Sequence, residues 1–214
     1  MDVLRLPWAE VRLLFHALSR HKTLSHIAIS SERGGRGIHD LLDNSFTPIR
    51  QSLCFTQLRT LRFKFPSCCI NLDNDLLLEA MSSWPHIRML EFMDPRAVPT
   101  VTFRGLSAAL RQCPRLHTLD IPLDAVNIDI DPTAESFQHT SLQYLNLTSS
   151  HISDAEAVAR IIFSMLPSVD RLLPPADQGY KAPSDVCLEV QRHLGSFRAS
   201  AGLGRHVTGA ASKT

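Results

Sequence analysis

Two short stretches of this chain carry residue types that could hold a ligand, and each lacks a part that such a site needs. Residues 34–37 read Gly-Gly-Arg-Gly, like a phosphate-binding loop, but no Gly-Lys-Ser/Thr ending follows, which favours an ordinary surface loop. Residues 127–131 alternate Asn and Asp with isoleucine, like the first half of a calcium-binding loop. Because Pro132 stands where that loop needs glycine and Gln138 where it needs glutamate, we expect no calcium site.

The histidines and cysteines lack the spacing of a catalytic or metal site. The ten histidines are dispersed, and pairs with helical spacing such as Glu189 and His193 have no evident third ligand. The five cysteines are an odd number with no Cys-x-x-Cys pair, which indicates reduced thiols in a reducing compartment. No Gly-x-Ser-x-Gly motif appears, and no cysteine has a catalytic context. The sequence therefore predicts that the protein is not an enzyme, has no catalytic residue, cofactor or metal, and is intracellular, in the cytoplasm or the nucleus.

The composition is that of an ordinary globular protein, but the charges are unevenly placed. One domain is expected for 214 residues of which 44% are hydrophobic and 20% are charged. The apolar runs are far shorter than the roughly 20 residues of a membrane helix, and the first residues lack a secretory signal, so we expect no membrane association. A net charge of +1 gives no general attraction for nucleic acid. Residues 1–66 hold ten Lys/Arg against five Asp/Glu, whereas residues 116–159 hold none against seven, so a partner should itself be bipolar.

A short apolar pattern, Leu-x-x-Leu-x-Leu or a close variant, returns six times and gives the chain its organisation. The six copies begin at Leu24, Leu58, Ile87, Leu116, Leu142 and Val169, at intervals of 26 to 34 residues. Self-similarity at this period is the signature of a leucine-rich-repeat solenoid, in which each copy is a strand. We therefore expect an α/β fold of about six long, irregular repeats, with parallel strands on the concave side and helices on the convex side.

Polar caps, apolar stripes and prolines predict helices between the strands. A carboxylate of Asp73-Asn-Asp75 is positioned to cap one helix and Thr102 a second, and Ser153-Asp-Ala-Glu156 is a capping box for a third. The helices are expected over residues 76–83, 105–112 and 155–165. Each should stop at a proline, which forces the preceding residue out of helical geometry. These stops are Trp84-Pro85, Cys113-Pro114 and Leu166-Pro167.

The ends of the repeat array need covers, because a terminal repeat would otherwise expose its core. Apolar stripes over residues 8–20 and 184–194 predict a helix at each end, so the repeat domain is expected to span 1–194. The Gly/Ala/Ser-rich tail, 195–214, is predicted to be disordered. Alternating residues within 124–136 could add a short strand.

Strand alternation predicts which side chains form the concave surface. If Leu61 and Phe63 point into the core, their neighbours along the strand point the other way. The predicted partner-binding residues are His26, Thr60, Arg62, Lys64, Met89, Glu91, Met93, Thr118, Asp120, Tyr144, Asn146 and Thr148. Six strands make a face roughly 24 Å across, which suits a protein partner better than a metabolite. The two methionines and the tyrosine resemble an adaptable interface core, although they could also be ordinary solvated strand positions.

The order of polar cap, apolar helix, proline stop and leucine pattern resembles the repeat region of F-box-like leucine-rich-repeat proteins, especially the fungal group with long repeats. The order is found at residues 73–92, 102–121 and 153–172. Cys113-Pro-Arg-Leu116-His-Thr-Leu119 also resembles the cysteine-containing repeat subtype of F-box receptors. In that family an F-box helix bundle binds the adaptor of a cullin-based ubiquitin ligase, and the repeats collect the substrate.

The resemblance implies a protein-binding role, as the substrate-receptor part of an F-box-type ubiquitin ligase. Residues 6–11, Leu-Pro-Trp-Ala-Glu-Val, are similar to an F-box opening. The first strand pattern follows at Leu24 and leaves no space for the remaining F-box helices, so an adaptor is expected as a partner only if an F-box exists outside or at the start of this chain. The alternative is a structural scaffold, or a gene fragment, with no ligase role.

Overall fold

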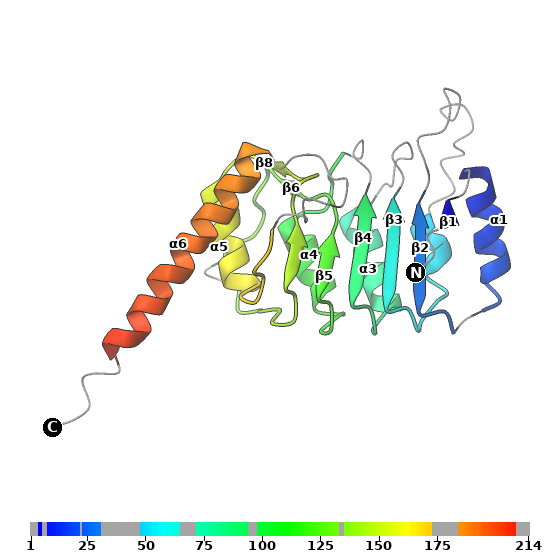
Figure 1. The fold of residues 1–214 in the computed structure, drawn as a ribbon, viewed down its shortest axis with the longest axis horizontal. Coiled ribbons are helices and arrows are strands. Elements are labelled where there is room, and N and C mark those ends of the chain that lie inside the picture. The colour runs from blue at the N-terminus through cyan, green and yellow to red at the C-terminus, as the bar shows by residue number, and fades with distance from the viewer. Residues whose placement is uncertain are drawn as a thin grey trace.

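The protein has an α/β fold in which helices alternate with the strands of a parallel sheet (Figure 1). The computed structural model describes residues 4–5, 8–21, 23–30, 48–64, 72–93, 98–132, 135–172 and 184–208. The main sheet has the order β1-β2-β3-β4-β5-β7, so each strand lies beside the next strand of the same sheet along the chain. Its strands are β1 (Leu4–Arg5), β2 (His26–Ser30), β3 (Thr60–Lys64), β4 (Met89–Met93), β5 (Thr118–Asp120) and β7 (Tyr144–Asn146). A second parallel pair joins β6 (Asp124–Ala125) to β8 (His151–Ile152).

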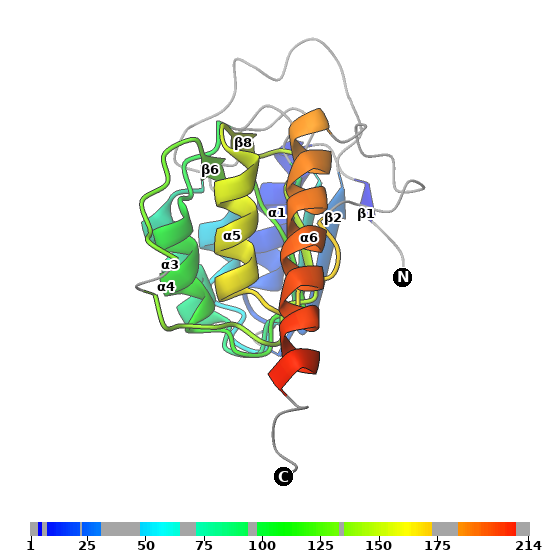
Figure 2. The same ribbon diagram turned by 90° about the vertical axis from the view of Figure 1, so that its left-hand side faces the viewer.

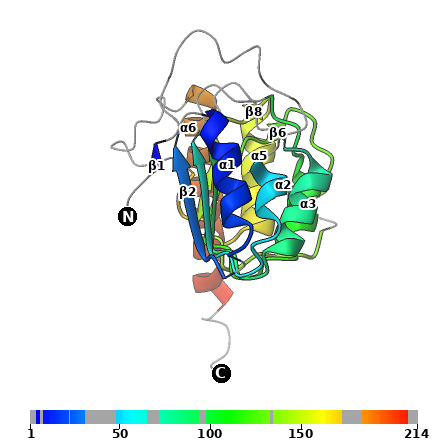
Figure 3. The same cartoon turned by 90° about the vertical axis from the view of Figure 1, so that its right-hand side faces the viewer.

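The helices cover one side of the sheet. They are α1 (Trp8–Leu18), α2 (Pro48–Ser52), α3 (Asn74–Ser83), α4 (Phe103–Leu110), α5 (Ala155–Met165) and α6 (Asp185–Thr208). Seen end-on, α1 to α5 lie together on the same side of the strands (Figures 2 and 3). Helix α6 lies at the end of the layers beside α5. The opposite side of the sheet, which these helices leave uncovered, is called the helix-free face below.

Five of the six apolar pattern sites are strands, and the sixth is not. Equivalent positions of the five are paired in register across the sheet: Ile27, Leu61, Leu90, Leu119 and Leu145. The sixth site, residues 169–172, forms only an isolated bridge between Arg171 and Tyr144. Its pattern is shortened, and the sequence continues with two prolines at 174 and 175, which cannot donate backbone hydrogen bonds. Strand β1 was not predicted, whereas β6 lies at the start of the stretch for which a short strand was considered.

The predicted N-terminal caps of α3 and α4 are confirmed, and each helix begins two residues before the expected range. The Asp73 carboxylate accepts a hydrogen bond from the Leu76 amide at 2.7 Å, and the Thr102 hydroxyl accepts one from the Gly105 amide at 3.3 Å. The proline stop is also seen at α3, where Trp84 has ψ 65°, outside the helical range. Helix α4 ends at residue 110, two residues before the expected end, so its last turn is shorter than the pattern indicated.

The predicted capping box of α5 is wrong by one residue. The cap is Asp154, whose carboxylate accepts a hydrogen bond from the Ala157 amide at 3.0 Å. The Ser153 hydroxyl instead donates to the carbonyl oxygen of Val126 at 3.2 Å. A carboxylate is the stronger acceptor at a helix N-terminus, and the serine is occupied by a loop that sequence spacing does not show.

One continuous hydrophobic core fills the space between the sheet and the helices. The paired strand leucines are fully buried, and so is Trp84. Three phenylalanines from α1, β3 and β4 meet in this core. The rings of Phe15 and Phe63 meet edge-on with their centres 5.8 Å apart, and Phe63 stacks on Phe92 with ring centres 5.6 Å apart. Because each element packs on the next, the core extends from α1 to α6.

Helix α6 corrects the prediction of a disordered tail after residue 194. The expected cover helix is present, with Val190 and Leu194 fully buried, but it continues to Thr208. Beyond Gly195, the Phe197 ring lies 6.1 Å from Phe163 of α5, and the Arg198 guanidinium donates to the carbonyl oxygen of Val169. These contacts stabilise α6 beyond Gly195, and composition alone does not predict them. The last turns of α6 extend past the sheet and the other helices (Figure 1). Residues 209–214 lie outside the described residues.

Gly105 on α4 lets the first turns of α3 and α4 approach each other closely. The Asn74 carboxamide accepts a hydrogen bond from the Thr102 amide at 2.9 Å, and its nitrogen lies 3.2 Å from the Thr102 hydroxyl. A Cβ at position 105 would lie 1.9 Å from the Asn74 carboxamide oxygen. We expect Gly105→Ala to displace this side chain and lower the free energy of unfolding by about 1–3 kcal/mol, measured by urea denaturation.

Gly195→Ala on α6 is the matched control, because nothing lies within 4 Å of the new Cβ. Alanine has the higher helix propensity, so this variant should gain about 0.5–1 kcal/mol. A Gly105→Ala protein as stable as the Gly195→Ala protein would contradict the proposed close approach.

Candidate functional site: the helix-free face of the sheet

The strand register arranges the predicted partner-binding residues in three rows across the helix-free face. The first row is His26, Thr60, Met89, Thr118 and Tyr144. The central row is Ala28, Arg62, Glu91, Asp120 and Asn146. The third row is Ser30, Lys64 and Met93, and Thr148 follows two residues after Asn146 at the same end of β7. Residues far apart in the sequence are thus brought together as predicted, because the strands pair without a shift.

The three rows differ in exposure. The first and third rows are at least partly exposed, including both methionines and the tyrosine. In the central row, Glu91 is 5%, Asp120 3% and Asn146 2% exposed. The prediction that these three side chains are presented to solvent is therefore wrong. Neighbouring rows are only about 6.6 Å apart along a strand, so longer side chains on either side can shield a shorter one between them.

Arg62 and Glu91 form an ion pair between β3 and β4. The Arg62 Nε donates to the Glu91 Oε2 at 2.6 Å, and the two side chains are 30% and 6% exposed. Burial of the carboxylate is offset by this charged partner. The positive charge of Arg62 is therefore directed at Glu91 of the neighbouring strand. An acidic group of a bipolar partner would have to compete with Glu91 for this arginine.

Tyr144 borders the buried carboxylates at the far end of the first row. The pKa of its hydroxyl is raised, firstly because burial disfavours the phenolate and secondly because Asp120 and Glu91 are negatively charged. Tyr144 is therefore a neutral hydrogen-bond donor at physiological pH. Beside it, the Asn146 carboxamide oxygen accepts hydrogen bonds from the amide and the hydroxyl of Thr148, at 2.9 and 2.8 Å. The last strand thus ends in a fixed polar corner.

A cysteine and a histidine lie close together on the helix side, but their bonds are structural. The Leu142 amide donates to His139 Nδ1 at 3.2 Å, so Nε2 carries the proton and donates to the Cys113 carbonyl oxygen at 2.9 Å. Burial raises the pKa of the Cys113 thiol to about 12, and its Sγ lies 3.5 Å from the Trp84 carbonyl oxygen. The thiol is therefore not a thiolate nucleophile at neutral pH. Trp84 is also hydrogen-bonded to the last residue of α2, because its indole N–H donates to the Ser52 carbonyl oxygen at 3.0 Å.

The acidic stretch that imitates a calcium loop has another role. The Asp129 carboxylate accepts a hydrogen bond from the Arg104 amide at 3.1 Å, and so joins the loop to α4. Within the part of the chain that the structure describes, no three His, Cys, Asp or Glu side chains are grouped so that they could hold a metal ion. No helix among the same residues has both the length and the apolar character needed to cross a membrane.

A groove on the helix side was missed by the sequence analysis. It has a volume of about 590 Å³ and follows the outer surface of α4. Arg104 of α4 and Arg111, the C-cap residue, both line it; Arg111 keeps helical backbone angles, so the spacing of seven residues puts the two on the same side. That spacing was visible in the sequence, but the segment that forms the opposite wall was not.

Comparisons with protein-family models, with curated proteins and with solved structures find no match to this chain. The helix-free face itself therefore provides the functional argument. It combines a recessed polar row with two flanking rows that hold thioethers, a phenol, hydroxyls and an amine. Such a surface can pack apolar groups and also donate and accept hydrogen bonds, which is the chemistry of polypeptide recognition.

Proposed function

We propose that this chain is a non-enzymatic protein-binding module, which holds a polypeptide partner across the helix-free face. We further propose that its fold is a leucine-rich-repeat solenoid of about six irregular repeats, with this face on the concave side. The in-register pairing of equivalent leucines and the one-sided helix layer support this reading. No cofactor is needed for such a role.

The observation that carries the proposal is the continuity of the first and central rows from β2 to β7. Met89 and Tyr144 lie in the same row, two strands apart, and both are partly exposed. Methionine adapts to an irregular partner surface, and tyrosine offers a large ring with a polar end. The partly buried Arg62–Glu91 ion pair in the adjacent central row joins β3 to β4, which favours a pre-organised face.

The narrower proposal is a substrate receptor of an F-box-type ubiquitin ligase, and the alternative is a scaffold without a ligase role. Helix α1 begins at Trp8, inside the segment similar to an F-box opening. Its residue Phe15 is 1% exposed and packs on Phe63 of β3, so α1 contributes to the core of the sheet layer. We therefore expect this chain alone not to retain the cullin-ligase adaptor in a pulldown, and retention of the adaptor would favour the receptor role.

The binding face is tested by affinity capture with the double variant Met89→Ala/Tyr144→Ala. Removal of the two largest partly exposed groups of the first row should weaken capture of the partner at least tenfold, because interface tyrosines and other large anchors carry much of the binding energy. Leu13→Ala/Leu188→Ala is the control, since these leucines are 70% and 48% exposed on α1 and α6. Equal capture by both double variants would argue against this face.

A further inference from the structure

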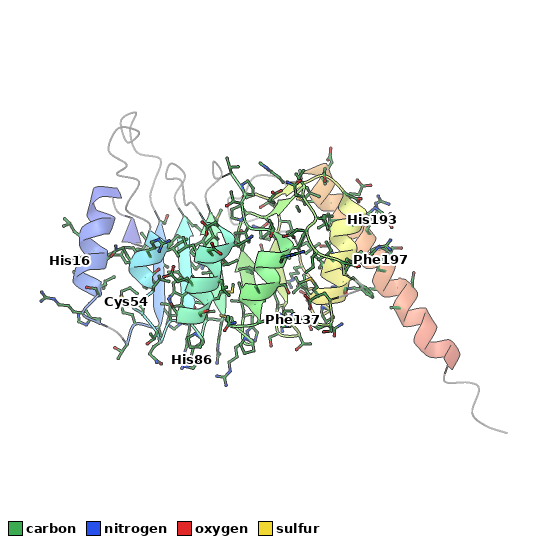
Figure 4. The ribbon with its side chains drawn as sticks, turned by 180° about the vertical axis from the view of Figure 1, so that it is seen from behind. His16, Cys54, His86, Phe137, His193 and Phe197 are labelled. Carbon is green, nitrogen blue, oxygen red and sulfur yellow. The ribbon has the colours of Figure 1, made fainter. Side chains whose placement is uncertain are left out.

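Basic side chains gather along the edge of the main sheet at which its strands begin. Backbone hydrogen bonds hold the residues that precede these strands side by side. The Arg88 amide donates to the Arg59 carbonyl oxygen at 2.8 Å, and the His117 amide donates to the Arg88 carbonyl oxygen at 2.8 Å. The turns before these strands also hold His86 and Arg115, and all five residues are exposed. We call these five residues the basic edge. It lies at the tails of the arrows in Figure 1, and His86 marks it at the lower margin of Figure 4.

The turns along this side of the sheet carry almost no negative charge. Their described residues are 19–21, 23–25, 53–59, 84–88, 112–117, 140–143 and 167–171. Among these residues are five arginines and a single acid, Asp170, which lies in the last turn. Two nearby acids, Glu79 and Glu135, are paired with Arg50 and Arg111, so they do not offset the charge of the turns.

The three arginines of the basic edge have no internal partner that explains them. Among the residues that the structure describes, the guanidinium groups of Arg59, Arg88 and Arg115 form no ion pair. Compensation of the helix dipoles does not account for them either. That effect is confined to the last turn of a helix, and the last turns of α3 and α4 hold no basic residue. The arginines therefore keep their donors for an anionic ligand.

Acids gather at the opposite edge, where α3, α5 and α6 begin. Asp73 and Asp154 cap α3 and α5, and the first turns of α3, α5 and α6 hold Asp75, Glu156 and Asp185. Positive and negative charges are thus separated between the two edges of the layers. The net charge of +1 therefore does not measure the attraction at either edge. An anionic ligand is drawn to the basic edge and repelled from the other.

The composition of these turns favours a phosphate backbone over a polypeptide as the ligand. Polypeptide interfaces have an apolar core, whereas interfaces with nucleic acid are more polar and more positively charged. The large apolar side chains that the described part of the chain exposes all lie outside these turns: Leu13, Leu78, Val98, Val126, Ile128 and Leu188. All five unambiguous cations of the turns are arginines, whose planar group binds phosphate through two parallel N–H donors.

The spacing of the strands favours a duplex. Neighbouring strands are about 4.8 Å apart, and a duplex presents a phosphate about every 3.4 Å along each of its strands. Each arginine therefore meets a phosphate whatever the base sequence, whereas a polypeptide would need an unbroken series of acids. Single-stranded nucleic acid is held largely by stacking of its bases on aromatic rings. Phe55 and Trp84 of these turns are buried and cannot stack on a base.

We propose that the basic edge binds the phosphate backbone of a nucleic-acid duplex without reading its sequence. The duplex lies across the starts of the strands, and Arg59, Arg88 and Arg115 donate to its phosphate oxygens. A lipid surface offers similar phosphates, but it is a plane, whereas the basic edge is one row of turns. The basic edge holds none of the residues of the helix-free face, so this inference does not depend on the function proposed for that face.

The test uses the full chain and fluorescein-labelled duplexes of about 20 base pairs in fluorescence anisotropy, with one DNA and one RNA probe of mixed sequence. The affinity should fall about fortyfold between about 50 and 200 mM salt, as expected when three phosphates are neutralised. A DNA duplex of unrelated sequence should bind within about twofold of the first. No binding of either probe at about 50 mM salt with protein up to about 100 μM, or an affinity that is independent of salt, would overturn the proposal.

A triple variant locates the binding. Arg59→Gln/Arg88→Gln/Arg115→Gln should bind at least tenfold more weakly at about 50 mM salt and lose most of the salt dependence. The matched control is Arg104→Gln/Arg160→Gln/Arg192→Gln, which removes the same charge from α4, α5 and α6, where these side chains are 75%, 58% and 68% exposed. It should bind within about threefold of the wild type. Equal weakening in the two triple variants would show that only the net charge matters and would refute the site.

Two further measurements exclude misfolding and other polyanions. Urea denaturation should give the three-arginine variant the wild-type midpoint, because the removed groups are exposed and unpaired. Arg88→Gln alone should lower the salt slope by about one, which gives a second reading of the site from a smaller change. Poly-glutamate and phosphatidylserine vesicles serve as competitors at equal concentrations of charge. Displacement of the labelled duplex by either competitor more readily than by unlabelled duplex would assign the edge to an acidic polypeptide or a membrane and overturn the proposal.

Discussion

Leu119→Ala should lower the free energy of unfolding by about 2–5 kcal/mol, because it opens a cavity in the middle of the core. Leu119 is fully buried and pairs in register with Leu90 on one side and Leu145 on the other. These neighbours are held by their own strands, so they cannot move far enough to fill the space. Urea denaturation, with the m-value checked for constancy, measures the loss.

Thr118→Ala is the neighbouring control for this cavity. Thr118 is partly exposed in the first row of the helix-free face, one residue before the buried leucine. Its substitution should change stability by less than about 1 kcal/mol. Similar losses in the two variants would show that the division of β5 into a core side and a helix-free side is wrong.

Arg62→Met should also be strongly destabilising, by about 2–3 kcal/mol, because it leaves the Glu91 carboxylate buried without its charged partner. The arginine side chain is 30% exposed, so solvent screens part of the interaction and the loss should be smaller than for a fully buried pair. Urea denaturation of the single variant measures this loss.

The double variant Arg62→Met/Glu91→Met separates the pair from the individual residues. It should recover most of the lost stability, because an apolar pair of similar length leaves no unpaired buried charge. A double-mutant cycle gives the coupling energy directly. If Arg62→Met alone is as stable as the wild type, or if the coupling is near zero, the ion pair does not hold β3 and β4 together.

Local signals in the sequence predicted most of the layered fold. The caps at Asp73 and Thr102 and the proline after Trp84 act within a few residues, so the chain itself contains the information that starts and stops α3 and α4. The leucine spacing predicts six strands, of which five are present, and it predicts which of their side chains enter the core. Burial on one side of the sheet fixes the register, because a shift by one residue would turn the leucines outward.

The errors come from contacts between distant residues. Alternation assigns Glu91 and Asp120 to the solvent side, but both are buried, and strand alternation alone does not show which side chains cover a position. The α5 cap moved by one residue because Ser153 bonds to a loop 27 positions earlier. Helix α6 continues past Gly195, where Phe197 lies against Phe163 of α5 and Arg198 donates to the carbonyl oxygen of Val169. The groove along α4 is lined in part by Ile130, Asp131 and Glu135, which lie between β6 and β7 in a segment that forms no helix. A search for motifs does not reveal such a groove.

Site-specific photo-crosslinking tests the proposed role of the helix-free face most directly. A photo-reactive amino acid is placed at position 89 on β4 or, as the control, at position 13 on α1, and each full-length protein is illuminated in its native lysate. The binding proposal predicts a discrete adduct with the same polypeptide that affinity capture retains, formed from position 89 and not from position 13. An adduct with that polypeptide from position 13 alone would contradict the proposal and would place the partner on the helix side.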